Sequence, residues 1–434
     1  MRPNLFRLST LLVYAAVAVM LLTLLVLLIV GGPSLIWYVR TSLLEVFSLA
    51  AAATASWFFF MRLIHRVGYP AHMLTSMVVF VGSLVLFLGV SLGTRHLLQY
   101  PQYGETYGPA EGPGLPLTNV LEFFRSIDEF ERVDDIAADP TAVPPPLRRE
   151  PQRVSLELET REVLADIAPG VSFNYWTFNG QVPGPMLRIR EGDTVDFTLR
   201  NHSSSLHDHN IDLHAVNGPG GGGEVTIVGP GEEKSFQFRA LNPGLYIYHC
   251  AVPNMAVHMT HGMYGLILVE PEGGLPEVDH EFYIVQGELF TAGTIGRRGL
   301  QVFDGGQMLD SNPNYVVFNG RTGALVEGME AEVGDRIRMY VGNGGVALSS
   351  SFHVVGEVFD TVYPEASMGG ALFHNVQTTS VLPGGATIVE FTVDVPGTYT
   401  LVDHALLRAD KGAWGVLHVM GEADPSVFDS EELR

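Results

Sequence analysis

The chain of 434 residues carries 47 acidic and 25 basic side chains, and its net charge of −22 at pH 7 argues against binding of nucleic acid. An acidic surface of this kind suits solvation or the docking of a basic partner. The length allows two or three domains, and the 48 glycines, 26 prolines and short runs of Val, Thr, Tyr and Phe favour antiparallel β domains for most of the chain. The single cysteine, Cys250, excludes an intrachain disulfide.

The first hundred residues form a separate, apolar segment. Residues 8–30, 43–60 and 73–93 are each long enough to cross a bilayer as a helix. Basic residues precede the first stretch and separate the second from the third, at Arg2, Arg7, Arg62 and Arg66. The positive-inside rule then predicts a multi-pass inner-membrane segment over residues 1–98, with a cytoplasmic N-terminus and the rest of the chain on the periplasmic side. Ionisable residues near the span ends suit either a quinol or proton path or the membrane interface: Glu45, His65, His72 and His96.

Residues 99–150 are rich in proline, glycine and acidic residues, which is typical of a linker. Within this linker, Asn119 followed by Glu122 is a helix N-cap signature. Apolar residues then recur on one helical face, at Val120, Phe123, Ile127, Phe130 and Val133. The pattern predicts a short amphipathic helix over residues 117–136, whose apolar face would contact the bilayer, the β domains or another subunit.

From about residue 151 the sequence repeats at an interval of roughly 140–155 residues, the size of one β-sandwich domain. Phe-Asn-Gly at 178–180 recurs at 318–320, and a Pro-Gly turn at 243–244 recurs at 396–397. Each Pro-Gly turn leads into a strand that ends at a histidine, His249 or His404. We therefore predict a mainly β fold with two tandem Greek-key sandwiches, over residues 151–273 and 274–434, preceded by the three transmembrane helices.

The first copy of the repeat contains the ligands of an electron-transfer copper. A copper that cycles between Cu(I) and Cu(II) is bound by a soft thiolate, two imidazoles and a weak axial thioether. Cys250, His258 and Met263 follow one another in a single loop, and His209 arrives from a distant strand. The spacing Cys-x7-His-x4-Met after an aromatic-rich strand predicts a mononuclear copper at these four residues. Coordination would also protect the lone thiol from oxidation.

Two positions of this ligand set have competitors in the same loop. Met255 and Met259 compete with Met263 for the axial position, and His261 is a second candidate imidazole. We favour Met263 because it directly precedes the predicted strand over residues 264–269. A buried free cysteine with surface histidines nearby is the alternative that needs no metal.

His249 precedes Cys250, so the alternation of side chains along a strand points its imidazole to the opposite side, toward a second metal. His214 lies five residues after His209, with Asp212 between them. A copper bound only by histidines, with an open position, can bind a substrate and reduce it with electrons from the thiolate copper. The second copy of the repeat has no cysteine, yet it retains His353 and His404, which suggests a further use for them.

Five motifs together resemble the copper-containing, nitric-oxide-forming nitrite reductases. They are His-Asn-Ile-Asp-Leu-His at 209–214, Gly-Leu-Tyr-Ile-Tyr-His-Cys at 244–250, Gly-Met-Tyr-Gly-Leu-Ile-Leu-Val-Glu-Pro at 262–271, Ser-Ser-Phe-His-Val-Val-Gly at 350–356 and Leu-Val-Asp-His at 401–404. The similarity covers residues 150–425. It implies two cupredoxin domains per chain, a homotrimer, and one type 1 and one type 2 copper per subunit, with the type 1 copper at the thiolate site.

The resemblance also implies the roles of the remaining residues. The type 2 copper would be bound by His214 and His249 of one chain and His404 of the next. Asp212 and His353 would deliver protons while nitrite is reduced to nitric oxide. Electrons would pass through Cys250 and His249, and Val355 would crowd the substrate pocket, where the family often has isoleucine.

The membrane segment departs from the commoner members of this family, which are soluble or lipid-anchored. It leaves the electron donor open between a c-type cytochrome, a small copper protein and a membrane quinol, and we favour simple anchoring to the lipid bilayer. Two other functions compete. A multicopper oxidase needs several His-x-His pairs and a His-Cys-His motif, whereas this chain has only the pair at 207–209 and Ala251 after Cys250. A copper electron carrier would leave the second set of histidines unexplained.

Overall fold

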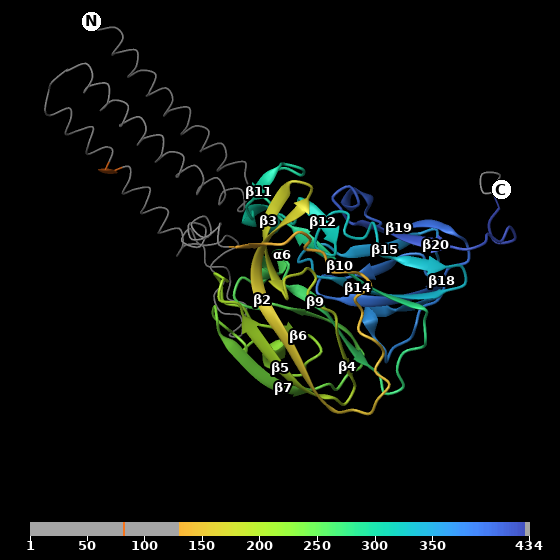
Figure 1. Cartoon of the computed structure of the whole chain (residues 1–434), viewed down its shortest axis with the longest axis horizontal. Helices are drawn as coiled ribbons and strands as arrows, with labels where there is room; N and C mark the ends of the chain where they lie inside the picture. Colours follow the sequence, from red (N-terminus) through yellow and green to blue (C-terminus); the bar gives the residue numbers. More distant parts are fainter. Residues whose placement is uncertain (1–80, 83–129, 430–434) are drawn as a thin grey trace, which may run out of the picture. The chain divides into compact units, whose positions relative to one another are not determined.

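The computed structural model describes residues 81–82 and 130–429 of the chain (Figure 1). Contacts divide the chain into two units, Met1–Gln99 and Tyr100–Arg434. The three predicted membrane spans lie outside the described residues, apart from the helical residues 81 and 82, and they stay predictions. Within the described ranges, no helix has the length and hydropathy that crossing a bilayer requires.

The first half of the second unit is a β-sandwich of two sheets. Its larger sheet has the strand order β11-β3-β2-β5-β7, with β1 paired to β2, and its smaller sheet has the order β4-β9-β8-β6. The larger sheet contains β1 (Glu131–Arg132), β2 (Arg153–Ala168), β3 (Val171–Phe178), β5 (Thr194–Asn201), β7 (Glu233–Arg239) and β11 (Gly299–Gln301). The smaller sheet contains β4 (Leu187–Arg190), β6 (Asp212–Leu213), β8 (Gly244–His249) and β9 (Tyr264–Glu270).

A second sandwich repeats this topology. One sheet has the order β12-β10-β14-β18-β16, made of β10 (His280–Leu289), β12 (Tyr315–Phe318), β14 (Arg336–Asn343), β16 (Thr361–Tyr363) and β18 (Ala386–Thr392). The other has the order β13-β20-β19-β15-β17, made of β13 (Glu330–Glu332), β15 (Ser350–Val355), β17 (Thr379–Val381), β19 (Gly397–Asp403) and β20 (Trp414–Met420). β10 pairs with β14 in parallel and with β12 in antiparallel fashion, as β2 does with β5 and β3. The repeat in the sequence is therefore a repeat of strand topology.

Few helices interrupt the strands within residues 130–429. They are α6 (Met255–Thr260), α7 (Gly305–Leu309) and the 3-10 turns η1 (Pro219–Gly222), η2 (Pro364–Ala366) and η3 (Leu406–Arg408). The repeated Phe-Asn-Gly turns have the same conformation, because Asn179 and Asn319 both adopt a left-handed backbone with φ of 57° and 47°. Asparagine tolerates this region better than most residues. Each side-chain oxygen also accepts a backbone N–H, from Glu159 and Val285 respectively, which locks the turn to a neighbouring strand.

The two sandwiches share a core. Each has its own buried apolar cluster, and a third cluster contains residues of both, such as Leu266 of β9 and Val285 of β10. β11 lies within the range predicted for the second domain, yet it pairs in parallel with β3 of the first sandwich. Burial of apolar surface between the sandwiches thus fixes β9 and β10 beside each other.

The predicted helix over residues 117–136 is wrong in its described part. Residues 117–129 lie outside the described residues, but Glu131 and Arg132 form β1 and pair in parallel with β2. Phe130 is buried, and Val133 packs against the shared core while its N–H donates to the Leu164 carbonyl. At residues 131–132 a strand takes the place of the predicted helix, because β2 supplies backbone partners there.

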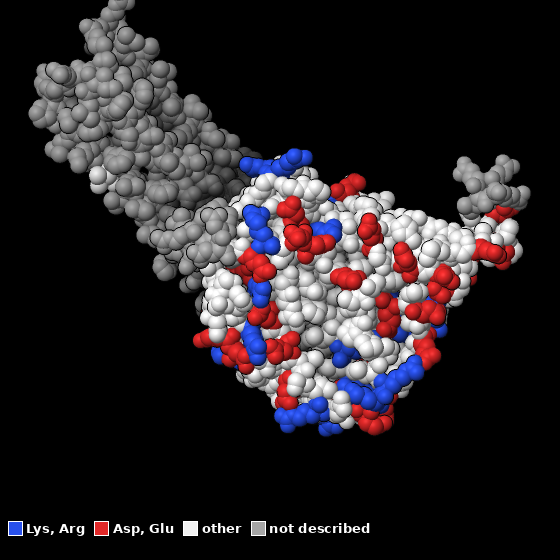
Figure 2. All heavy atoms as spheres, viewed as in Figure 1, with Lys and Arg blue, Asp and Glu red and all other residues white. Residues whose placement is uncertain are grey.

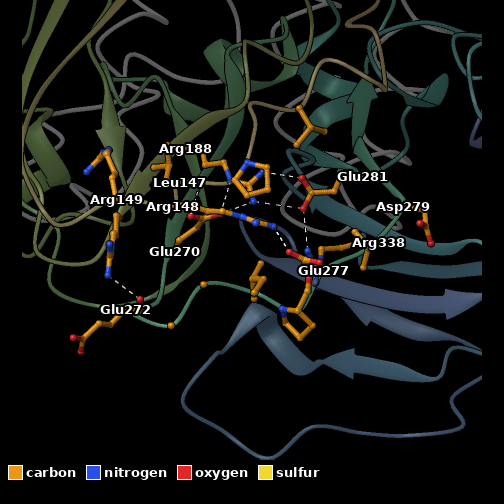
Figure 3. A pocket seen from close by; sticks show the side chains of 18 of the residues that line it. Leu147, Arg148, Arg149, Arg188, Glu270, Glu272, Glu277, Asp279, Glu281 and Arg338 are labelled. Carbon is orange, nitrogen blue, oxygen red and sulfur yellow. Dashed lines mark hydrogen bonds and ion pairs between the residues drawn. The ribbon is translucent and has the colours of Figure 1, made fainter.

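A cavity of about 950 Å³ opens between the sandwiches and is lined by arginines and carboxylates from both (Figure 3). Arg188 forms ion pairs with Glu270 at 2.5 Å and Glu281 at 2.8 Å, and Arg338 forms one with Glu281 at 3.0 Å. Glu390 completes this network at 2.6 Å from Arg338. The two arginines are almost fully buried, so their pairing is needed to offset desolvation. None of the predicted site residues lines this cavity.

Figure 2 shows acidic and basic side chains interspersed over one face of the molecule. Exposed ion pairs between neighbouring strands illustrate the pattern, as between Arg153 of β2 and Asp196 of β5 at 2.5 Å. Arg161 of β2 and Glu131 of β1 form another at 2.7 Å. The basic side chains of these two pairs therefore lie directly beside carboxylates.

Candidate metal centres

The side chains of His209, Cys250 and His258 converge inside the first sandwich. The Cys250 Sγ lies 3.3 Å from Nδ1 of His258 and 3.9 Å from Nδ1 of His209, and the two nitrogens are 3.3 Å apart. The exposed fractions are 0% for His209 and Cys250 and 5% for His258. Three buried donor atoms thus face one point, and the structure brings together three of the four residues predicted for the thiolate copper.

Three segments position these donors. Cys250 directly follows β8, and His258 lies on the short helix α6, which begins after the left-handed residue Asn254. His209 is held by a reciprocal pair of backbone hydrogen bonds with Val228. Asn210 then joins the segments, because its side-chain oxygen accepts the Ala251 N–H at 2.6 Å and its own N–H donates to the Cys250 Sγ at 3.5 Å.

The structure shows which of the candidate ligands in the loop lie at the donor cluster. His261 lies outside the donor cluster, since its Nδ1–H donates to the Val257 carbonyl at 2.7 Å and its ring stacks on Trp176 at 4.2 Å. Met263 is fully buried, its carbonyl accepts the Cys250 N–H, and its own N–H donates to the His258 carbonyl. Its backbone thus adjoins two donors, and its axial role stays a prediction.

The chemistry of this cluster fits copper. Burial raises the pKa of the Cys250 thiol to about 12, and burial lowers the pKa of His258 well below its usual range. Without a cation the pocket would therefore hold a neutral thiol and a neutral imidazole. A buried thiolate needs a nearby positive charge, and a thiolate with two imidazoles is the donor set that a soft electron-transfer copper prefers.

A second cluster lies on the other side of the same strand and contains Asp212, His214 and His249. The Nε2 atoms of His214 and His249 are 3.0 Å apart, and Nε2 of His249 lies 4.0 Å from a carboxylate oxygen of Asp212. Asp212 of β6 stands directly opposite His249 of β8 in the sheet. The His249 Nδ1–H donates to the Cys250 carbonyl at 3.0 Å, which leaves its Nε2 lone pair for a metal.

The electrostatics of this second cluster also favour a bound cation. Burial raises the pKa of Asp212, an effect that the neighbouring His214 partly offsets. Desolvation lowers the pKa of His214, whose side chain is covered only in part, and of the buried His249. Neutral imidazoles with free Nε2 atoms are suitable ligands for copper or zinc, and the residues present fit such a metal.

A glycine-rich turn, which the sequence analysis missed, encloses Asp212. A Cβ atom on Gly221 of η1 would lie 1.9 Å from the Asp212 Oδ1 and 2.9 Å from the Leu213 carbonyl oxygen. Gly221 also has a φ of +54°, which disfavours other residues. The run of four glycines at 220–223 was the available signal, because such a run permits a close approach of the backbone to a side chain.

His353 and His404 form a separate pair in the second sandwich. Their ring centroids are 5.4 Å apart, and β15 and β19 hold them side by side through the His404 N–H bond to the Ser351 carbonyl. The His353 Nδ1–H donates to the Gln377 carbonyl at 2.5 Å. Val355 ends β15 with 49% of its surface exposed. Among the described residues, the metal cluster of His214 and His249 does not include His404, so the structure of one chain does not bring the three predicted ligands of the second copper together.

Comparisons with known proteins agree with this donor chemistry. A family model described as "Multicopper oxidase" matches residues 160–274. Copper-containing nitrite reductases of Neisseria meningitidis serogroup B and Neisseria gonorrhoeae are each 51% identical over 305 residues, which are 69% of this chain and 77% of each relative. The copper-containing nitrite reductase of Neorhizobium galegae is 30% identical over 337 residues, covering 72% of this chain and 88% of the relative.

Solved structures give the same result. The copper nitrite reductase from Nitrosomonas europaea has a TM-score of 0.56 at 31% identity, covering 65% of this chain and 99% of that one. The copper-containing nitrite reductase from Thermus scotoductus has a TM-score of 0.55 at 34% identity, covering 63% of each chain. The fold is thus the mainly β, cupredoxin-like fold that the sequence predicts, and the chain belongs to the family of copper-containing nitrite reductases.

Proposed function

We propose that the protein reduces nitrite to nitric oxide in denitrification, with one electron and two protons consumed and one water released. Membership of the copper-containing nitrite reductases supports the reaction. The observation that carries the proposal is the position of two consecutive residues: the Cys250 side chain joins one donor cluster and the His249 side chain joins the other. A single strand end would thereby connect an electron-accepting site to a substrate site.

Each cluster has its own task in this proposal. When bound, one type 1 copper per subunit would exchange electrons at Cys250, and one type 2 copper would bind and reduce nitrite at the histidine site. The His249–Cys250 peptide is the short covalent link between them. His249 also donates Nδ1–H to the Cys250 carbonyl, which fixes the orientation of its ring toward the second cluster.

Asp212 and His353 are the proton donors in this proposal. Breaking an N–O bond of nitrite requires protons delivered to the departing oxygen. Burial raises the pKa of Asp212, so its carboxyl can hold a proton at higher pH than an exposed aspartate. The His353 Nδ1–H bond to Gln377 leaves Nε2 as the nitrogen that can exchange a proton. Val355 beside His353 would shape the pocket for nitrite.

The second site would be completed by a neighbouring subunit in a homotrimer. His214 is exposed on one half of the site, and His404 is exposed on the other. Apolar side chains follow His404 in the chain: Leu406 and Leu407 of η3 have exposed fractions of 58% and 79%. Exposed apolar residues of this size next to an unfinished ligand set are typical of a subunit interface.

The predicted location and electron supply remain part of the proposal. Residues 1–98 would anchor the enzyme in the inner membrane, with the two sandwiches in the periplasm. A c-type cytochrome or small copper protein would then dock near the thiolate site. Membrane quinol is the alternative donor, and assay of turnover with each reduced donor distinguishes them.

The purified, copper-loaded protein tests the proposed function. Electron paramagnetic resonance should show two distinct Cu(II) signals, and nitrite with a reductant should yield nitric oxide at a stoichiometry of one electron per nitrite. Oxygen uptake is measured in parallel, because a multicopper oxidase would consume oxygen instead. A single copper signal without nitric oxide would contradict the proposal.

A further inference from the structure

Glu162 of β2 is fully buried beside the segment that presents His209. Its Oε1 accepts the backbone N–H groups of Leu206 at 2.7 Å and His207 at 2.9 Å, and it bonds to Nδ1 of His207 at 2.9 Å. The interior of the first sandwich therefore contains a carboxylate that one loop holds through two backbone N–H groups and one imidazole.

The same carboxylate faces the outer nitrogen of His209. The His209 Nε2 lies 3.7 Å from the Glu162 Oε1, slightly beyond hydrogen-bond length. Within the part of the chain that the structure describes, the His209 Nε2 and the Glu162 Oε2 are buried without a hydrogen-bond partner. The Nδ1 atom on the opposite side of the ring faces Cys250 and His258. The imidazole thus stands between the donor cluster and the carboxylate.

The second sandwich has an equivalent glutamate. The parallel pairing of β2 with β5 ends at Thr160, and the parallel pairing of β10 with β14 ends at Gln286. Glu162 and Glu288 each lie two residues beyond these points. Both are buried, with exposed fractions of 0% and 2%. They occupy matching positions in the structural repeat.

The Glu288 carboxylate binds a loop in the same way, but this loop contains no histidine. Its Oε1 accepts the N–H of Leu348 at 2.7 Å and of Ala347 at 3.4 Å, as Glu162 does for the loop before His209. The loop at 344–349 contains no histidine. Both glutamates therefore hold a loop, and of the two only Glu162 also faces imidazoles.

We propose that Glu162 is a positioning residue of the thiolate copper site. Its carboxylate holds the His209 ring with the proton on Nε2 and the Nδ1 lone pair toward Cys250, and its negative charge favours the oxidised metal. Carboxylate partners of ligating histidines commonly act in this way. His207 moderates the effect, because its bond to Oε1 competes for the same oxygen. The inference depends on the copper site of the proposed function.

Three variants of the full-length, copper-loaded protein test this role. Glu162→Gln removes the charge but retains an oxygen for the backbone N–H groups. His207→Phe removes the imidazole donor and retains a ring against Trp176, which packs on His207 at 4.2 Å. Glu288→Gln is the matched control in the second sandwich. For each variant, the reduction potential of the thiolate copper, its visible spectrum, its rate of loss to a chelator and the melting temperature are measured.

The expected shifts have opposite signs. Glu162→Gln should raise the potential by about 59 mV, a tenfold change in the ratio of reduced to oxidised copper, and should speed copper loss by roughly 10–100-fold. His207→Phe should lower the potential, because the carboxylate then interacts more strongly with His209. Glu288→Gln should change neither quantity, whatever its effect on melting.

Two results would overturn the inference while leaving the copper site intact. The first is a Glu162→Gln potential and copper-loss rate that match those of Glu288→Gln. The second, which decides the matter if Glu162→Gln does not fold, is an unchanged or raised potential in His207→Phe. Absence of a thiolate copper signal in the unaltered protein would instead contradict the proposed function.

Discussion

His249 and Cys250 are adjacent in the chain and face two different donor clusters. The His249 Nε2 lies 3.0 Å from the His214 Nε2, whereas the Cys250 Sγ lies 3.3 Å from the His258 Nδ1. Alternation of side chains at the end of β8 produces this arrangement. Any change that moves the end of β8 should therefore affect both clusters together, while changes in η1 should affect only the second.

Replacement of either proposed proton donor should lower turnover strongly while the copper stays bound. Asp212→Asn and His353→Ala each remove a group that can give a proton to nitrite, so nitric oxide formation should fall by roughly 10²–10⁴-fold. Copper content and both Cu(II) signals should persist. His418→Ala, an exposed histidine of β20 in the sheet that also contains His353, is the control and should retain full turnover. Undiminished turnover in Asp212→Asn would remove that residue from the mechanism.

Gly221→Ala should disturb Asp212 directly. The new Cβ would meet the Asp212 Oδ1, so the carboxylate must move away from its position opposite His249. We expect turnover to fall at least tenfold, with the thiolate copper spectrum unchanged. Gly180→Ala provides the comparison, because its φ of +75° is also left-handed but no heavy atom lies within 4 Å of the added Cβ. Both variants should lose about 1–2 kcal/mol of stability, and equal turnover in the two would contradict the argument.

The sequence was most informative where the chemistry is local. Cys250 and His258 are eight residues apart in one loop, so their joint role could be predicted from spacing, and the position of His249 follows from strand alternation. The choice between His258 and His261 could not be made in this way. It depends on α6, whose last turn directs the His261 Nδ1–H to the Val257 carbonyl.

Contacts between distant strands could not be predicted from the sequence. Glu162 reaches His207 only because β2 pairs in parallel with β5, which leads into that loop. No residue pattern around Glu162 predicts this contact. The helix predicted over 117–136 failed for the same reason at residues 131–132, because an i, i+3 apolar pattern does not reveal that β2 offers a partner for a strand.

Glu357 should make the second sandwich less stable as pH rises. Burial, followed by the charge of Asp394, raises the pKa of Glu357 to about 7 from an ordinary value of 4.5. The folded state therefore binds an extra proton between these two values, so stability falls as pH rises through this window. Glu357→Gln should match the unaltered protein below pH 4.5 and exceed it above pH 7. After a discount for partial exposure, the gain should be about 1 kcal/mol.

Thermal melts from pH 4 to pH 8 measure this difference. The quantity compared is the melting temperature of Glu357→Gln minus that of the unaltered protein, so that other titrating groups cancel. Glu327→Gln changes an exposed glutamate in the same way and serves as the control for the substitution itself. A constant difference for Glu357→Gln would show that the pKa of Glu357 is the same in the folded and the unfolded protein, and would contradict this prediction.

Sharing of the second site between subunits can be tested by complementation. His214→Ala disables one half of the site and His404→Ala disables the other, so each variant alone should be inactive. Chains of the two kinds, carrying different tags and expressed together, should form mixed trimers that are purified over both tags. In a mixed trimer, a single interface pairs an intact His214 with an intact His404. Turnover should therefore return to about one third of the normal value per trimer, together with a type 2 Cu(II) signal of similar fraction.

Mixing the two purified variants after assembly is the control and should give no activity. If the purified mixed trimers are as inactive as their parents, all the ligands come from one chain and the exposed His404 has another role.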